Sequence, residues 1–336
     1  MMRILYIGNK LARHGNNSTS IDTLGTLLEA EGFKMTYASS AKNQIMRMLE
    51  MLWKTLCSAG KVNYVLIDTY STANFWYAFA VSQLCRVLGL KYIPILHGGN
   101  LPQRLRNNPK ISRMIFANSH CNVSPSGFLV SAFAEAGHTN VVYIPNSIEI
   151  SNYSFRSRAQ FNCKILWVRS FAKIYNPLMA LEVMNHLQSP YASATLCMVG
   201  PDKENMMPAI KQSAADLGIN VTFTGPLTKK QWTELADHYD IFINCTHFDN
   251  MPVSVIEAMA LGLPVVSTNV GGIPFLLQHG KTALLVDDND SAGMASRITE
   301  LINNQQLASS IAVNARILAE EFDWLKVKKD WLEILR

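Results

Sequence analysis

The sequence predicts an α/β protein of two domains, and three observations support that prediction. The chain has 336 residues, which is more than one hydrophobic core usually holds. Short apolar segments of strand length alternate with longer amphipathic segments along most of the chain, in the order expected for a parallel sheet with covering helices. This series of strand, loop and helix occurs twice, on either side of a polar stretch at residues 149–162.

Each half is expected to form a Rossmann-like domain, because strands and helices alternate throughout both halves. The first domain should cover residues 1–148, beginning with the strand Arg3–Ile7. Residues 149–162 lack apolar periodicity, and we predict that they are a linker. The second domain should cover residues 163–321, and residues 322–336 should form a last helix.

Composition is typical of a globular protein with a large core, since 49% of the residues are apolar and 16% are charged. The six cysteines occur singly, without the spacing of a metal site, so we expect free thiols in a reducing cytosol. The first residues lead directly into a strand and show no secretory signal. Phe75–Leu90 is the most apolar stretch and is too short to span a bilayer, so we expect a cytoplasmic protein.

Charge is unevenly distributed along the chain. Residues 1–150 contain 14 Lys and Arg against 7 Asp and Glu, a balance of +7, and the remainder contains 16 against 18, a balance of −2. A basic half can serve a membrane surface, an acidic acceptor or nucleic acid, or it can have no function of its own.

Residues 41–59 have the spacing of an amphipathic helix, with a stripe formed by Ile45, Met48, Leu49, Leu52 and Leu56. Two interpretations stay open. The stripe can pack on the sheet, as most such stripes do. Alternatively, a basic helix that carries Trp can lie on an anionic membrane, which would make the protein peripheral on the inner face of that membrane.

The stretch HFDNMPVSVIEAMALGLPVVSTNVGGIP, residues 247–274, has the strongest functional pattern. Pro252 suits the first turn of a helix that ends at Gly262, so a helix N-terminus with unpaired N–H groups is expected at residues 250–253. Asp249 and Glu257 flank this anion site, and the glycines at 271 and 272 can let backbone approach a ligand. The alternative is the ordinary content of an α/β domain, with Glu257 in a surface ion pair.

Charged and polar residues also follow two predicted strands. Arg169 and Lys173 come after an apolar strand in the second half, and His97 comes at the end of one in the first half. Open α/β sheets bind ligands at the carboxyl ends of strands, where two cations can balance a diphosphate. Surface charges and a structural histidine are the alternatives. Residues 101–110 are rich in bases and turn formers, and we predict a loop there.

Taken together, the two acids with seven residues between them, followed by AMALGLPVV and VGGIP, resemble the signature of retaining glycosyltransferases with the GT-B fold. The family is family 4, also called glycosyl transferases group 1, and it contains sucrose synthases and bacterial mannosyltransferases. The usual form has Glu at both ends of the spacing, whereas this chain has Asp249 at the first. Family members also usually carry an acid where this chain has Phe275. Weaker similarities are VTFTG, which ends at Gly225, and IPNS, which contains Asn146.

The resemblance implies transfer of a sugar from a nucleotide diphosphate onto an acceptor, with retention at the anomeric carbon. It implies that Asp249 holds hydroxyls of the donor sugar and that Glu257 holds those of the ribose. Arg169 and Lys173 would clamp the diphosphate, and His97 would position the donor or the acceptor. Nine further residues are expected to bind the donor: Gly15, Gly98, Gly200, Phe223, Gly225, Asn250, Met251, Pro252 and Val253.

The resemblance also implies that the first domain binds the acceptor and that the second binds the donor across a cleft, with the last helix crossing back to the first domain. We expect a UDP-, GDP- or ADP-sugar as donor and no metal or other cofactor. The acceptor can be a glycan, a lipid-linked sugar or a small molecule, and we expect no nucleic acid partner. A subunit that binds nucleotide sugars without turnover is an alternative, and so is an epimerase or phosphorylase of the same fold.

Overall fold

The computed structural model of the protein describes residues 1–10, 19–41 and 43–336. The chain forms two compact units. Unit 1 consists of Met1–Pro145 together with Asp330–Arg336, and unit 2 consists of Asn146–Lys329. Within the described residues, no helix combines the length and the apolar character needed to cross a membrane.

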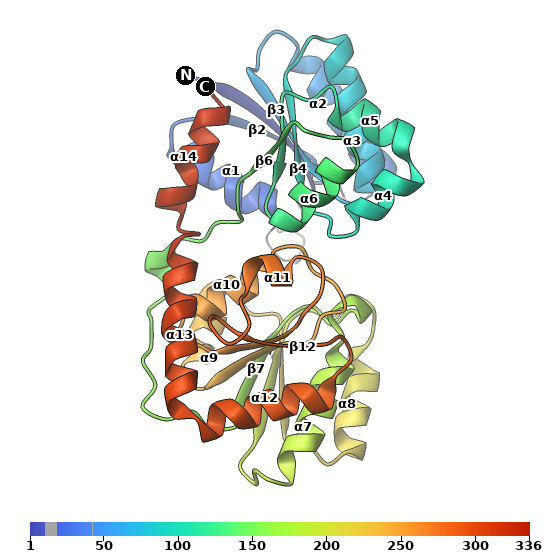
Figure 1. The fold of residues 1–336 in the computed structure, drawn as a ribbon. Coiled ribbons are helices and arrows are strands. Elements are labelled where there is room, and N and C mark those ends of the chain that lie inside the picture. The colour runs from blue at the N-terminus through green and yellow to red at the C-terminus, as the bar shows by residue number, and fades with distance from the viewer. Residues whose placement is uncertain (11–18, 42) are drawn as a thin grey trace. The chain divides into compact units, whose positions relative to one another are not determined.

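Unit 1 is built on a parallel sheet, which has six strands among the described residues, in the order β2-β1-β3-β4-β5-β6 (Figure 1). The strands are β1 Arg3–Ile7, β2 Lys34–Ala38, β3 Tyr64–Thr69, β4 Tyr92–Leu96, β5 Asn122–Ser124 and β6 Val141–Tyr143. The helices are α1 Ser20–Ala30, α2 Gln44–Cys57, α3 Asn74–Val87, α4 Leu101–Asn107, α5 Pro109–Phe116 and α6 Gly127–Glu135. Every residue of β3 and β4 is buried, because helices cover the sheet.

Two features of unit 1 differ from the sequence predictions. The loop predicted for residues 101–110 is helical, because Pro102 and Pro109 each lie in the first turn of a helix, where proline is tolerated, and Leu101 and Leu105 are buried. The stripe predicted to pack on the sheet from α2 is divided. Met48 and Leu52 are half-buried against the core of unit 1, whereas Ile45, Leu49 and Leu56 are exposed.

Unit 2, in which every residue is described, also has a parallel sheet of six strands, in the order β12-β11-β10-β7-β8-β9. The strands are β7 Lys164–Val168, β8 Thr195–Val199, β9 Val221–Gly225, β10 Ile241–Asn244, β11 Val265–Thr268 and β12 Leu284–Val286. The helices are α7 Pro177–Gln188, α8 Met207–Asp216, α9 Lys229–Ala236, α10 Val253–Ala260, α11 Ile273–Leu276, α12 Ser291–Asn303 and α13 Gln305–Glu320. Two short 3₁₀ helices are η2 Ile150–Asn152 and η3 Lys173–Tyr175, and α14 Trp324–Ile334 begins in unit 2 and ends in unit 1.

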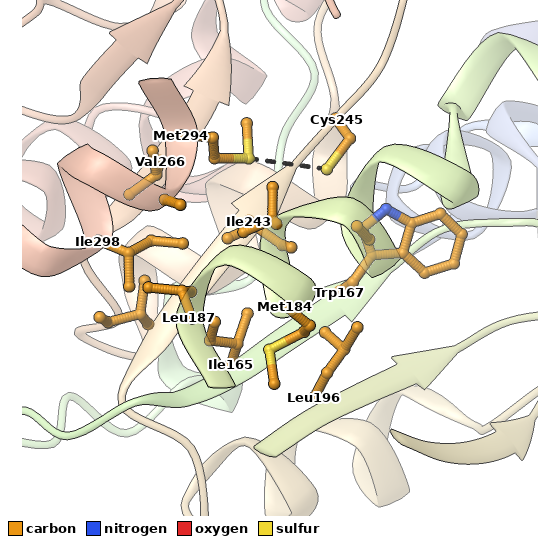
Figure 2. Close-up of a cluster of buried hydrophobic side chains, with 14 of the residues drawn as sticks. Ile165, Trp167, Met184, Leu187, Leu196, Ile243, Cys245, Val266, Met294 and Ile298 are labelled. Carbon is orange, nitrogen blue, oxygen red and sulfur yellow. Dashed lines mark hydrogen bonds between the residues drawn. The ribbon is translucent and has the colours of Figure 1, made fainter. Parts of the chain in front are cut away.

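The core of unit 2 lies on both faces of the central strands. Figure 2 shows one of its clusters, in which Trp167 from β7 and Ile243 from β10 meet residues of α7 and α12. The Cys245 sulfur lies 3.7 Å from that of Met294 in this cluster. All six cysteines of the chain are free, and only Cys57 is exposed. The scattered cysteines of the sequence are therefore mostly core residues.

The segment predicted to be a linker, residues 149–162, is packed on unit 2. Tyr153 and Phe161 are buried, and so is Arg158. The Arg158 guanidinium donates to the Gly262 carbonyl at 2.8 Å, and burial lowers the pKa of this side chain to about 10. Single aromatic residues without periodicity hold the segment in place, which is why its sequence suggested a linker.

Candidate functional site

The predicted donor residues of unit 2 gather where its strand order reverses, between β7 and β10. In open α/β sheets, ligands bind outside the carboxyl ends of the strands at this point. Arg169 directly follows β7, and Asn244 ends β10. The sheet therefore places the predicted cation beside the start of the carboxylate loop.

Arg169 is held in a network of polar side chains. Its Nε and Nη2 both donate to Asn244 Oδ1 at 3.1 Å, and Asn244 Nδ2 donates to Ser267 Oγ at 2.9 Å. Nη2 also lies 2.7 Å from Asp249 Oδ2, in contact but not aligned as a hydrogen bond. The guanidinium carbon lies 5.1 Å from the centroid of the Tyr175 ring. The sequence assigned Arg169 and Asp249 to different parts of the donor, whereas the structure pairs them.

The loop from Asp249 is fixed by the Gly-Gly turn. The carbonyl of Asp249 accepts a hydrogen bond from the Gly272 N–H at 2.8 Å. A Cβ on Gly271 would lie 2.3 Å from the Asp249 carbonyl oxygen, and one on Gly272 would lie 1.8 Å from that of Asn250. The sequence predicted that these glycines let backbone approach a ligand. In this structure, they are required because the backbone of residues 249 and 250 approaches them closely.

Three of the predicted donor residues, Asn250, Met251 and Pro252, are buried before α10 begins at Val253. Asn146 donates from Nδ2 to the Met251 carbonyl at 2.9 Å, which gives the residue of the IPNS motif a role in supporting this loop. Because these side chains are buried, the groups of this turn best suited to bind an anion are the backbone N–H groups at the helix N-terminus.

Glu257 lies one turn into α10 and is 4% exposed. Its Oε1 accepts a hydrogen bond from the Tyr153 hydroxyl at 2.6 Å and lies 2.9 Å from Lys229 Nζ. Burial is the main cause that raises the pKa of Tyr153, and the Glu257 carboxylate raises it further. The Tyr153 hydroxyl therefore remains a donor, and its contribution to stability is present below the ordinary tyrosine pKa of ~10 and is lost as pH rises through the folded-state value.

Replacing Tyr153 with phenylalanine should lower the free energy of unfolding by about 1–3 kcal/mol, because a buried carboxylate loses a hydrogen-bond donor. If Glu257 holds the ribose, the same change should raise the KM for the donor more than it lowers kcat. Denaturant unfolding and steady-state kinetics measure the two effects. Tyr191→Phe, a partly buried tyrosine packed against the core of the same unit, is the control. An unchanged KM for the donor would indicate that Glu257 does not take part in donor binding.

The remaining predicted residues of unit 2 lie on neighbouring strand ends. Lys173 is exposed, and its N–H donates to the Glu204 carboxylate at 3.0 Å. Gly200 has a φ of +149°, and a Cβ there would lie 1.8 Å from the Arg169 carbonyl oxygen. Gly225 accepts from the Gly200 N–H at 3.0 Å, and Phe223 is partly buried.

In unit 1, His97 follows β4 and contacts a buried carboxylate. Its Nε2 lies 2.8 Å from Asp68 Oδ1, which also accepts from the Tyr6 hydroxyl at 3.0 Å. The Tyr70 ring lies 5.1 Å from the imidazole, measured between centroids. Gly98 is tightly placed, because a Cβ there would lie 2.6 Å from the Ser71 nitrogen. The predicted donor residue Gly15 lies outside the described residues.

Four residues that support the site are not among those predicted from the sequence, namely Asn244, Tyr153, Asp68 and Tyr175. Asn244 and Asp68 had a signal that could have found them, since each is polar at the end of an apolar strand. Tyr153 and Tyr175 had none, because an isolated tyrosine in a polar segment has no pattern around it.

The chain resembles known proteins in sequence and in fold. Residues 162–304 match the family described as glycosyl transferases group 1. The chain is 33% identical over 121 residues to the 2-deoxystreptamine N-acetyl-D-glucosaminyltransferase of Niallia circulans, a match that covers 36% of this chain and 31% of that relative. The chain thus spans less than a third of the length of this curated relative.

Two solved structures resemble the chain over its whole length. HepE of Anabaena, determined with UDP and glucose, has a TM-score of 0.79 at 18% identity and covers 100% of this chain and 99% of its own. Sucrose-phosphate synthase of Thermosynechococcus elongatus has a TM-score of 0.82 at 15% identity and covers 99% of this chain and 98% of its own.

The two Rossmann-like units, with their parallel sheets, therefore define an α/β protein of the GT-B fold. Within that class, the segment that matches the glycosyl transferases group 1 lies in unit 2.

Proposed function

We propose that this protein is a glycosyltransferase that moves a sugar from a nucleoside diphosphate to an acceptor, with retention at the anomeric carbon. The observation that carries the proposal is the meeting of Arg169, Asp249 and the N-terminus of α10 at the switch point of unit 2, inside the segment that matches the family. Ligands bind at such points, and a cation beside a helix N-terminus suits a diphosphate.

The chemistry assigned to these residues is stabilisation of a leaving group. The bond between the anomeric carbon and the diphosphate oxygen breaks, and the diphosphate leaves with the electron pair. The acceptor oxygen forms the new bond to the same carbon and passes its proton to the departing diphosphate oxygen. Arg169, Lys173 and the N–H groups at the start of α10 stabilise the negative charge where it develops. The proposal requires no protein-bound metal and no cofactor besides the donor.

The acids and the histidine have positioning roles in this proposal. Asp249 holds hydroxyls of the donor sugar, and Glu257 holds those of the ribose. His97, whose ring is oriented by Asp68, positions the donor or the acceptor. The acceptor is a glycan, a lipid-linked sugar or a small molecule that binds to unit 1.

A donor screen tests the function. We expect a UDP-, GDP- or ADP-sugar to raise the melting temperature, because a ligand that binds the native state stabilises it. UDP is a reasonable first choice, since HepE, which resembles this chain in fold, was determined with it. With the stabilising donor and a set of acceptors, release of the nucleoside diphosphate should follow, and the anomeric configuration of the product shows retention or inversion.

The screen also separates the alternatives. A donor that binds but is not consumed with any acceptor would indicate a subunit that only binds nucleotide sugars. Conversion of the donor without an acceptor would indicate an epimerase, and release of a sugar phosphate in the presence of inorganic phosphate would indicate a phosphorylase. Each of these results would contradict the proposed transfer.

A further inference from the structure

Helix α2 of unit 1 exposes apolar side chains. Ile45 is 71% exposed and Trp53 is 65% exposed. Three more residues of this helix are at least 48% exposed, namely Met46, Leu49 and Leu56. A folded protein can leave single apolar residues in water, but a contiguous group marks an interaction site.

The orientation of α2 explains this exposure. Its buried residues are Arg47, Met51 and Thr55, which share one side of the helix. At ~100° per residue, the exposed apolar residues lie on the side opposite Met51 and point away from the sheet. The Arg47 side chain turns inward because its Nε donates to the Ala41 carbonyl at 2.9 Å and its Nη1 donates to Asn9 Oδ1 at 3.1 Å. Met48, Met51 and Leu52 pack on the core of unit 1, and the other apolar side chains named above face solvent.

The neighbouring helix extends this surface. Helix α3 packs beside α2, and α5 packs beside α3 (Figure 1). Trp76 and Val87 of α3 are 42% and 83% exposed. We use the name α2–α3 apolar face for the exposed apolar residues of these two helices: Ile45, Met46, Leu49, Trp53, Leu56, Trp76 and Val87.

The helices that carry and flank this face are mainly basic. Helices α2, α3 and α5 contain five Lys and Arg and one acid, Glu50. Glu50 is engaged by Lys54 at 3.4 Å and by the Ser39 hydroxyl. In contrast, Arg86, Lys110 and Arg113 are exposed on α3 and α5.

We propose that the α2–α3 apolar face docks on the surface of an anionic lipid bilayer. The apolar side chains would enter the boundary between headgroups and acyl chains, and the surrounding cations would contact the headgroups. A tryptophan at the centre of such a surface suits the interfacial region of a bilayer. The inference depends on unit 1 alone and goes beyond sugar transfer, because the protein can bind to a bilayer whether or not it turns over a sugar donor.

The cations near the α2–α3 apolar face favour a bilayer over a second copy of this chain as its partner. A symmetric dimer through the α2–α3 apolar face would bring the cations of α3 and α5 of both copies to one interface. Helices α2, α3 and α5 offer those cations one acid, Glu50, which Lys54 already engages. An anionic bilayer supplies the missing negative charge and an apolar interior together.

Sedimentation with vesicles tests the proposal. The full chain should bind vesicles made of equal parts phosphatidylcholine and phosphatidylglycerol and should bind phosphatidylcholine alone much less. Leu49→Glu combined with Trp53→Glu should weaken binding to the anionic vesicles at least ~10-fold. The matched control is Val313→Glu with Ile317→Glu, since both residues are exposed on α13 of unit 2 at the same spacing. The control pair should bind as the unmodified chain does.

Two further measurements test the role of the surface cations and the depth to which Trp53 enters the bilayer. Lys110→Gln with Arg113→Gln should weaken binding and reduce its dependence on salt. Lipids brominated on the acyl chains should quench Trp53 in a Trp76→Phe variant, because the remaining tryptophans, Trp167, Trp232, Trp324 and Trp331, are at most 4% exposed. Circular dichroism verifies that each variant remains folded.

Three results would overturn the proposal: no binding of the unmodified chain to anionic vesicles, binding of the Leu49→Glu/Trp53→Glu variant as tight as that of the control variant, or no quenching of Trp53 by the brominated lipids. Light scattering after size exclusion can give a fourth overturning result. A dimer that dissociates when Leu49 and Trp53 are changed, together with no lipid binding, would show that another copy covers the face.

Discussion

Replacing Arg169 with alanine should lower kcat for sugar transfer at least ~100-fold, as expected when a donor that stabilises developing charge is removed. The structure adds a second reason. The substitution leaves the carboxylate of Asp249, whose side chain is 17% exposed, without the cation that lies 2.7 Å away. Unpairing a buried charge also costs stability, by about 3–5 kcal/mol where burial is complete. Turnover at saturating donor and denaturant unfolding measure the two losses.

Two variants separate the chemical effect from the structural one. Lys173 is exposed, so Lys173→Ala should reduce turnover by a similar factor while leaving stability almost unchanged. Arg297→Ala is the matched control, because Arg297 belongs to a surface pair with Glu300 in the same unit, and neither turnover nor stability should change. Rates that stay unaltered in Arg169→Ala would place this residue outside the reacting site.

Replacing Gly200 with alanine should destabilise unit 2 by at least ~3 kcal/mol. The residue has a φ of +149°, and the added Cβ would lie 1.8 Å from the carbonyl oxygen of Arg169, which belongs to rigid backbone. Relief of this overlap must move the end of β7, so donor binding should be lost together with stability. Hydrogen exchange of the β7 and β8 amides measures the local loss of protection, and thermal shift with the donor measures binding.

Gly218 offers the matched control for this substitution. Its φ is +62°, and a Cβ there would have nothing within 4 Å. Gly218→Ala should therefore cost only about 1 kcal/mol, which is the strain of a left-handed backbone without any overlap, and should leave donor binding intact. If both glycine variants lose the same stability, the close approach to Arg169 is not the cause.

The sequence predicted much of the fold, because alternating strands and helices determine the order of elements along the chain. It also indicated Arg169, Asp249 and the start of α10, since each has a local pattern. It could not show that Arg169 contacts Asp249. That contact exists because β7 and β10 are neighbours in the sheet, and strand order is a property of the tertiary fold.

The predictions that differ from the structure have a similar origin. Periodicity predicted α2 correctly as a helix and Met48 and Leu52 as packing residues, but the helix is rotated so that the rest of the stripe is exposed. The contacts of Arg47 with Asn9 and the Ala41 carbonyl, which favour this rotation, leave no mark in the pattern. Tyr153 and Phe161 anchor a segment that was predicted to be a linker. In each case, a few long-range contacts decide the outcome, and local composition does not encode them.

The glycine pair at 271 and 272 has a consequence for protein engineering. Because it holds the backbone of Asp249 and Asn250 in place, a longer side chain at 249 cannot be accommodated by a shift of the loop. Exchange of Asp249 for glutamate would extend the carboxylate by one bond, ~1.5 Å, from an unmoved anchor point. If Asp249 holds the donor sugar as proposed, the length of the side chain at this position should therefore change the choice between donor sugars.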